Sequence, residues 1–193
     1  MVGTEDRQSA GFVISPLLAN IYLHYSFDFW VNVWRKKYAQ GEVVVLRYAD
    51  DIIAGFQFET DAVRFLEDLG KRLEKFGLEL HPEKTRRIEF GRFAERNRER
   101  KGEGKPETFD FLGFTHISGK NGLGRFAVRR TTIRKRMRAK LREIKQQLRQ
   151  RMHDPVAETG KWLKSVVQGY FNYHAVPGNL TSLGVFRDRV LAL

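Results

Sequence analysis

The feature that most constrains the fold is a pair of adjacent carboxylates set between two apolar runs, in the stretch Arg-Tyr-Ala-Asp-Asp-Ile-Ile at residues 47–53. Apolar residues at 43–46 precede the pair, and apolar residues at 52–54 follow it. Short apolar runs on both sides of a polar bend are typical of two strands joined by a tight turn. The pattern therefore predicts a β-hairpin with Asp50 and Asp51 at its tip.

The chemistry of this acidic pair supports two interpretations. Aspartate favours turns because its side chain bonds to nearby backbone, which explains one aspartate at a bend without any function. It explains two less well, since neighbouring ionised carboxylates disfavour each other's charge unless a cation neutralises them. Hard divalent cations such as Mg²⁺ bind such oxygen ligands, and nucleotidyl transfer uses two of them about 4 Å apart. A plain turn and a metal site both stay open on the pair alone.

Hydrophobic periodicity and turn residues predict the other elements and indicate an α+β fold. Ser15 as N-cap and Pro16 at the first helical position begin a long helix. Pro82 forbids a helix in the turn after the second one. The predicted elements are helices at 16–38, 60–76, 131–152 and 156–175, a short strand at 86–90, an exposed loop at 91–107, and a strand pair at 109–117 and 125–130 joined by the turn 118–124.

Positive charge is concentrated in one part of the chain. The formal net charge is +12, and between Arg125 and Arg151 twelve basic residues stand against one acid, Glu143. This shift in composition near residue 125 suggests a boundary between two modules. Such localised charge indicates a polyanion partner, most often nucleic acid, and a solvated helix face is the alternative. The apolar stripe of the helix expected there consists of Ile133, Met137, Leu141, Ile144 and Leu148.

Composition excludes several classes of protein and site. The chain has no cysteine, which excludes disulfides and thiolate metal sites. No apolar run approaches the ~20 residues of a membrane span, and the N-terminus lacks the pattern of a signal peptide. His81, His116 and His153 show no metal-ligand spacing. We therefore expect a soluble, cytoplasmic protein without a membrane partner.

The motifs around the acidic pair resemble one known family. Gly-Phe-Val-Ile-Ser-Pro-Leu-Leu-Ala-Asn-Ile-Tyr-Leu-His at 11–24 precedes the pair, and His-Pro-Glu-Lys-Thr at 81–85 and Phe-Asp-Phe-Leu-Gly-Phe-Thr-His at 109–116 follow it. In this order they are similar to the reverse transcriptases encoded by group II introns, the intron maturases, from about Gly11 to Asn179. The resemblance implies a right-hand polymerase, with an unmatched tail at 1–10, a partial palm at 11–124, and a helical thumb or maturase module at 125–193.

The resemblance also implies roles for individual palm residues. Asp50 and Asp51 would be catalytic residues that bind Mg²⁺ in a two-metal site. Lys84 would neutralise the leaving pyrophosphate, and an ordinary surface lysine is the alternative. Phe111 and Phe114 belong either to a hairpin that grips the primer or to the core. The residues expected to contact nucleotide or primer are Gly11, Ser15, Pro16, Tyr48, Ala49, Phe111, Leu112 and Gly113.

The implied thumb is expected to bind RNA. Arginine and lysine contacts to phosphate give affinity that depends on salt and carry little sequence information. Aromatic residues at helical spacing are more often core, so Trp162 and Phe171 are assigned to the core, and Tyr173 and His174 are kept as candidates for RNA contact. The residues expected to bind RNA are Arg129, Arg130, Arg134, Lys135, Arg138, Arg142 and Lys145.

Two departures from the family pattern shape the functional expectation. Ser9 and Ala10 stand before Gly11, where the family usually has Pro-Gln. The family's third metal-binding aspartate has no matching residue, because Glu5 and Asp6 are the only acids before the match.

We therefore expect an incomplete RNA-directed DNA polymerase with a maturase role in RNA splicing. Its missing carboxylate would come from a fingers-containing polypeptide, and RNA, primer DNA and dNTP would be its partners. A non-catalytic RNA-binding remnant is the alternative, and a fragment without function is a third possibility.

Overall fold

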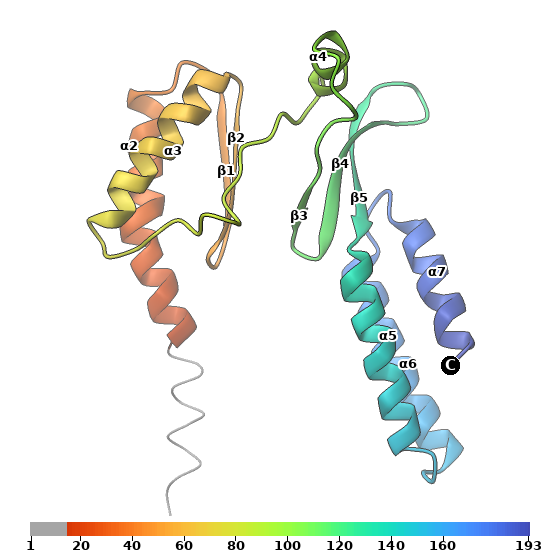
Figure 1. The fold of residues 1–193 in the computed structure, drawn as a ribbon. Helices are drawn as coiled ribbons and strands as arrows, with labels where there is room; N and C mark the ends of the chain where they lie inside the picture. Colours follow the sequence, from red (N-terminus) through yellow and green to blue (C-terminus); the bar gives the residue numbers. More distant parts are fainter. Residues whose placement is uncertain (1–14) are drawn as a thin grey trace, which may run out of the picture. The chain divides into compact units, whose positions relative to one another are not determined.

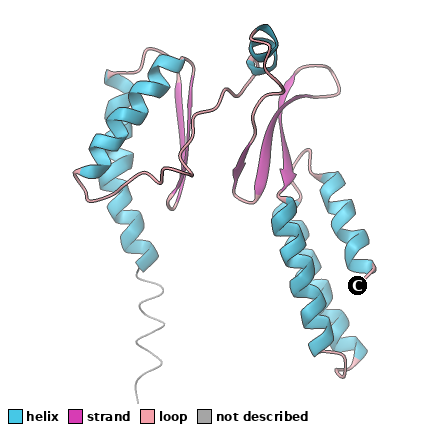
Figure 2. Ribbon diagram, viewed as in Figure 1, coloured by secondary structure: helices cyan, strands magenta, loops and turns pink. Residues whose placement is uncertain are grey.

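The computed structural model describes residues 15–193 (Figure 1). The chain divides into two compact units, one ending at Arg87 and the other spanning Ile88–Leu193. Each unit combines helices with a small antiparallel sheet (Figure 2), which confirms the α+β fold. The division into a palm at 11–124 and a thumb at 125–193 stays a prediction, and residue 125 lies in the connection between two paired strands of the second unit.

The first unit packs two helices against a hairpin. A helix runs over residues 15–23, continues through the π-helical turn η1 (His24–Asp28) and ends as α2 (Phe29–Lys37). The hairpin consists of β1 (Val43–Tyr48) and β2 (Asp51–Phe56), and α3 (Glu59–Glu74) follows. These bounds confirm the predicted hairpin and the predicted helices at 16–38 and 60–76, apart from the π-turn.

The core of the first unit is rich in aromatic side chains. Trp34 and Phe65 meet edge to face with ring centroids 5.0 Å apart, a favourable geometry for aromatic pairs. Residues of β1 alternate as a strand requires, so Val45 packs against the core while Leu46 and Tyr48 are exposed. The buried members of this core are Phe27, Val31, Trp34, Phe65, Leu69 and Leu73.

The second unit joins a three-stranded sheet to a group of helices. Helix α4 (Ala94–Arg100) precedes the antiparallel strands β3 (Phe109–Phe111), β4 (Phe114–Lys120) and β5 (Phe126–Thr132). Helices α5 (Arg134–Gln150), α6 (Val156–His174) and α7 (Leu180–Leu191) follow. The predicted helices at 131–152 and 156–175 are thus confirmed within a few residues.

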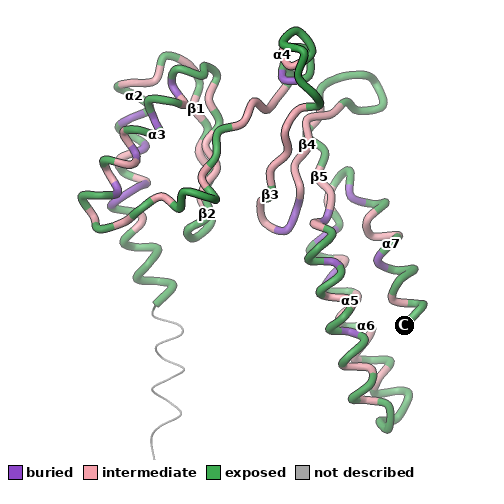
Figure 3. The backbone as a smooth tube through the Cα atoms, in the orientation of Figure 1, coloured by how far each residue is buried: buried purple, intermediate pink, exposed green. Residues whose placement is uncertain are grey.

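The apolar stripe of α5 lies in the core of this unit, as expected. Met137 and Ile144 are buried, and Leu141 and Leu148 pack against the same cluster. Trp162 and Phe171 of α6 belong to it as well, which confirms their assignment to the core. Buried and half-buried positions therefore recur every three to four residues along α5, separated by exposed ones (Figure 3).

Two predictions for residues 86–107 are wrong. Residues 86–90 form no strand, and Phe90 instead packs edge to face on Phe109, with ring centroids 4.9 Å apart. The segment 91–107, expected to be a loop from its polar composition, contains α4. This short helix has one buried anchor, Ala94, and is otherwise polar.

The strand predicted at 109–117 is also wrong in part, because it is two strands joined by a tight turn. Leu112 and Gly113 have φ of 46° and 82°. Positive φ at two successive positions reverses the chain direction instead of continuing a strand. β3 and β4 therefore pair with each other, with Phe111 opposite Phe114.

None of the helices within residues 15–193 has the length and apolar character needed to cross a membrane.

Candidate functional site

The acidic pair lies at the tip of the first hairpin. Tyr48 pairs with Asp51 in the strand register, so Ala49 and Asp50 form a two-residue loop. Ala49 has φ of 54°, and positive φ at the first central position is a feature of type II′ turns, where glycine is the usual residue. A non-glycine residue held in this region stores strain, which is common at functional sites.

Both carboxylates of the pair are exposed and free. Asp50 and Asp51 are solvent-exposed, and neither has a hydrogen-bond or ion-pair partner among residues 15–193. Adjacent ionised carboxylates without a basic partner repel each other, and a bound cation removes this repulsion. The structure thus brings Tyr48, Ala49, Asp50 and Asp51 together at one exposed tip, as the sequence predicts.

The donor chemistry of this tip fits Mg²⁺. That ion is usually bound through one or two carboxylates, together with waters and substrate phosphates. No group of three or more His, Cys, Asp or Glu side chains that could hold a metal occurs in the described part of the chain. The tip therefore offers two carboxylate ligands, and within residues 15–193 no further acid joins them.

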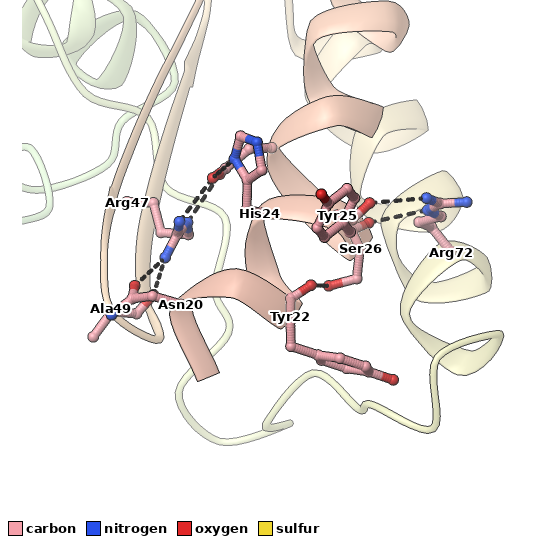
Figure 4. A network of polar contacts seen from close by, with 9 residues as sticks. Asn20, Tyr22, His24, Tyr25, Ser26, Arg47, Ala49 and Arg72 are labelled. Atoms are coloured by element: carbon pink, nitrogen blue, oxygen red, sulfur yellow. Dashed lines mark hydrogen bonds and ion pairs between the residues drawn. The ribbon is translucent and has the colours of Figure 1, made fainter. Parts of the chain in front are cut away.

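Arg47 links the acidic turn to the long helix (Figure 4). Its Nε and Nη2 atoms donate to the two carboxylate oxygens of Asp28, at 2.9 and 2.7 Å. Its Nη1 atom donates to the backbone carbonyl of Ala49 at 3.0 Å and to Oδ1 of Asn20 at 2.9 Å. One guanidinium therefore ties the strained residue of the turn to two side chains of the helix.

The electrostatics of this link are nearly balanced. Hydrogen bonds from Arg47 are the main reason that the pKa of Asp28 lies below its usual value, and His24 lowers it further. The nearby Asp28 in turn raises the pKa of Arg47. The charge of Arg47 is thus largely neutralised by Asp28, which leaves the two acids of the turn without a compensating cation.

The π-helical turn η1 provides the position of Asp28. π-helical turns are rare in proteins, and those that occur are often found at functional sites. Arg72 of α3 donates to the carbonyls of Tyr25 and Ser26, at 3.2 and 3.0 Å, and the hydroxyl of Ser26 donates to the carbonyl of Tyr22 at 2.9 Å (Figure 4). These bonds satisfy backbone groups within the irregular turn and fix it to α3.

The other described palm candidates of the first unit are not part of the acidic hairpin. Ser15 and Pro16 are exposed at the start of the described helix. Gly11 lies outside the described residues. Lys84 is exposed in the turn after α3, and no hydrogen bond or ion pair joins it to Asp50 or Asp51. The roles expected for these residues stay predictions.

The predicted primer-contact residues form a second strained turn, within the second unit. Leu112 has positive φ, and its carbonyl accepts a hydrogen bond of 2.9 Å from the hydroxyl of Tyr173 in α6. The carbonyl of Gly113 accepts the backbone N–H of Ile133 at 3.1 Å. The turn is therefore held by the residues that begin α5 and end α6. Phe111 is half-buried and Phe114 is buried, so Phe114 belongs to the core.

Of the two aromatic candidates for RNA contact in α6, one is wrong. His174 is buried, its Nδ1 atom bonds to the carbonyl of Tyr170 at 3.0 Å, and burial lowers its pKa. A buried side chain cannot meet RNA. Tyr173 is exposed and stacks on Phe114 with ring centroids 6.0 Å apart, and its RNA contact stays a prediction.

The basic residues of α5 form an exposed stripe. The stripe residues recur at steps of four, four, three and four positions, which places them on one helix face: they are Arg134, Arg138, Arg142, Lys145 and Arg149, all of them exposed. No acid among residues 15–193 pairs with them, because Glu143 bonds instead to Lys140 at 2.8 Å. Of the other predicted RNA contacts, Lys135 and Arg129 are exposed and Arg130 is half-buried.

Comparison with known proteins identifies one family. The family model described as reverse transcriptase (RNA-dependent DNA polymerase) matches residues 4–116, which is more than half of the chain. No curated protein matches the chain. The matched range includes both strained turns and ends before α5 begins.

Proposed function

Because this chain belongs to the reverse transcriptase (RNA-dependent DNA polymerase) family, we propose that it takes part in RNA-templated DNA synthesis of the group II intron type, with Asp50 and Asp51 as its metal ligands. The observation that carries this proposal is the pair of exposed, unpartnered carboxylates on the strained tip of a braced hairpin. The two acids lie inside the range that the family model matches.

The carboxylates would hold Mg²⁺ together with the phosphates of the incoming nucleotide. When bound, this ion supplies activation of the attacking 3′-hydroxyl and stabilisation of the leaving pyrophosphate. Tyr48 and the small side chain of Ala49, exposed beside the acids, would contact the nucleotide and the primer end. Lys84 would neutralise charge on the pyrophosphate.

The second unit would hold nucleic acid. The turn at Leu112 and Gly113 would contact the primer strand, and the stripe of α5 would contact phosphates of RNA. The stripe spans sixteen residues of helix, from Arg134 to Arg149, and the rise between the two ends is about 22 Å. Nucleic acid presents a regular row of phosphates, and the stripe presents a row of five exposed cations without acid partners that could contact them.

The resemblance to group II intron reverse transcriptases implies a third metal-binding aspartate, and within residues 15–193 no further acid joins the two at the tip. We propose that a fingers-containing polypeptide provides it. Two features support this partner: the β1–β2 sheet has two strands in the described part of the chain, and the outward face of β1 exposes Val44, Leu46 and Tyr48. Unpaired strand edges and exposed apolar residues are typical of surfaces that another segment covers.

Primer extension on an RNA template tests the catalytic proposal. With Mg²⁺ and a polypeptide that supplies fingers and the further acid, we expect DNA synthesis, and we expect Asp50→Asn to abolish it. Asp188→Asn is the matched control, because Asp188 is an exposed acid that bonds to its neighbour Arg187. Synthesis that survives Asp50→Asn contradicts the metal-ligand role, and robust synthesis by the purified chain alone contradicts the need for a partner.

A second candidate function is RNA binding without catalysis, as a maturase-like module that stabilises folded intron RNA. The unpartnered basic stripe of α5 favours it. We expect RNA affinity to fall steeply as salt rises, and Arg138→Glu combined with Arg142→Glu to weaken binding and reduce the salt dependence. Arg187→Glu, a charge reversal in α7 away from the stripe, is the control. RNA binding that is retained in Asp50→Asn, without any DNA synthesis by the unsubstituted chain and partner, favours this second function.

A further inference from the structure

We propose that Arg47 and Asp28 are positioning residues of the acidic turn, which set its geometry and keep its negative charge available for a divalent cation. This proposal rests on the proposed function. Neither residue is expected to touch substrate or metal. Their effect is exerted through the backbone of Ala49 and through the distribution of charge around the turn.

The backbone of the turn needs support. Ala49 has φ of 54°, a conformation that disfavours side chains larger than a hydrogen atom and that persists where surrounding contacts enforce it. The carbonyl of Ala49 belongs to the same peptide group as the N–H of Asp50. A hydrogen bond of 3.0 Å from Nη1 of Arg47 to this carbonyl therefore fixes the plane of the peptide that leads into the first acid.

The guanidinium that makes this bond is itself fixed. All three of its nitrogen atoms donate, two of them to the carboxylate of Asp28 and the third to Asn20 as well as Ala49. A bidentate arginine–carboxylate pair has defined geometry, which lysine cannot reproduce with its single ammonium group. The side chain of Arg47 is 15 % exposed, and that of Asp28 is 27 % exposed, so water competes little for these bonds.

The support continues to a second helix. Asp28 lies in η1, and Arg72 of α3 bonds to two carbonyls of that turn. Hydrogen bonds therefore fix the backbone of η1 to α3, and the side chain of Asp28 in η1 then bonds to Arg47, which bonds to the acidic turn (Figure 4). Residues that are far apart in the sequence thus determine the position of Asp50.

Asp28 also has an electrostatic role. Without it, the positive charge of Arg47 would lie beside the turn and compete with a divalent cation for the acids. With it, the pair is close to neutral, and the two carboxylates of the turn keep their full attraction for Mg²⁺. This role predicts that Asp28→Asn, which keeps the size of the side chain, weakens cation binding.

The test uses the full 193-residue chain with Mn²⁺ as the probe. Mn²⁺ affinity is measured by the broadening of the amide signals of Asp50 and Asp51, and the rigidity of the turn by amide exchange over residues 48–52. We expect Arg47→Lys and Asp28→Asn each to weaken Mn²⁺ binding by about 10- to 100-fold, as loss of partners behind metal ligands commonly does. We expect Arg47→Lys also to speed exchange at the turn.

Arg87→Lys is the control, because Arg87 makes a single exposed ion pair, with Glu59 at 3.4 Å. The proposal is overturned if Arg47→Lys and Asp28→Asn match this control in both measurements. If Arg47→Lys fails to fold, Asp28→Asn decides by Mn²⁺ affinity. If Mn²⁺ does not broaden the unsubstituted turn, the proposed metal site fails, and amide exchange in Arg47→Lys alone decides whether Arg47 positions the turn.

Discussion

The two hairpin tips of this protein use the same backbone device with different chemistry. Each is a two-residue turn whose first central residue is not glycine yet has positive φ, Ala49 in the first unit and Leu112 in the second. In each, the carbonyl of that residue accepts a hydrogen bond from a side chain, from Arg47 at 3.0 Å and from Tyr173 at 2.9 Å. Strain in both turns is thus balanced by one specific donor.

The donors show what separates the two turns. Arg47 comes from the same hairpin and carries a charge that Asp28 neutralises, so the first tip presents two free carboxylates. Tyr173 comes from α6, 61 residues away, and is neutral. The second tip is thus fixed to α6, and through the N–H of Ile133 to the start of α5, which carries the basic stripe. A shared backbone geometry therefore presents two free carboxylates in the first unit and is fixed to helices in the second.

The largest loss of stability is expected from Gly113→Ala in the second turn. Gly113 has φ of 82°, and a Cβ atom there would lie 3.5 Å from the side chains of Arg136 and Tyr173. The left-handed conformation costs an L-residue about 1–3 kcal/mol, so the second unit should lose about that much stability. The control is Gly122→Ala, since Gly122 lacks positive φ and has open space around it.

Unfolding in urea, followed by the indole NMR signals of Trp162 and Trp34, measures this effect in each unit separately. A loss at Trp162 with no change at Trp34 is expected. Equal stability of Gly113→Ala and Gly122→Ala would contradict the view that the second turn is strained.

A smaller effect is expected from Tyr173→Phe. This change removes the hydroxyl that bonds to the carbonyl of Leu112 and keeps the ring that stacks on Phe114. The loss of one such hydrogen bond should lower the stability of the second unit by about 0.5–1.5 kcal/mol. Tyr38→Phe is the matched control, as the hydroxyl of Tyr38 has no hydrogen-bond partner among residues 15–193. The same urea titration applies, and no difference between the two variants would show that the second turn does not depend on its donor.

Acidification should distinguish the units as well, through His174 at the end of α6. Burial lowers the pKa of His174 in the folded protein, so the unfolded chain binds a proton at pH values where the folded chain does not. The contribution to stability is complete above the unfolded pKa of about 6.5 and is lost as the pH falls below it. Thermal unfolding from pH 7.5 to 5.5 should show this decline at Trp162. Burial also lowers the pKa of His116 in the same unit, so the decline should persist in full in His153→Asn and become smaller in His174→Asn. A decline in His174→Asn equal to that in His153→Asn would exclude His174 as a contributor.

No loss of stability is expected from Ala49→Gly. Glycine removes the strain of positive φ, which costs an L-residue about 1–3 kcal/mol, but adds freedom to the unfolded chain, which costs about 0.5–1 kcal/mol. The stability of the first unit should therefore stay the same or rise by up to about 2 kcal/mol, whereas Ala54→Gly within β2 should lower it by at least about 0.5 kcal/mol. The signal of Trp34 in urea reports both variants. A large loss in Ala49→Gly would mean that the first turn is not strained, which would break the parallel with Leu112.

Local patterns predicted the parts of the fold whose cause is local. The acidic hairpin follows from apolar runs around a bend, and the buried apolar stripe of α5 follows from the spacing of Met137, Leu141 and Ile144. Buried positions must recur with the period of the element, so these patterns are visible in any single sequence. The motifs around Asp50 also indicated the polymerase family, which the match over residues 4–116 shows.

The wrong or absent predictions concern contacts between distant residues. Leucine rarely adopts positive φ, so the sequence around Leu112 does not predict a turn there. The turn is stabilised by a hydroxyl from the distant helix α6. Likewise, the π-turn is fixed by Arg72, which lies 46 residues after Ser26. The one local clue to Arg47 is its place directly before Tyr48. Asp28 is the only acid within residues 15–37, which is the clue to its partner.

The π-turn within the long helix makes the spacing of the chain as important as its composition. Such a turn contains one residue more than the regular α-helix on either side of it. An in-frame deletion of a single codon within 24–27 would restore the regular helix and leave residues 15–23 facing as before relative to α2. The carbonyls of this stretch would then accept the regular helical N–H groups and would be less available to Arg72, although no residue identity in the acidic hairpin had changed. Sequence comparisons of related genes should therefore treat length in this stretch as a functional character in its own right.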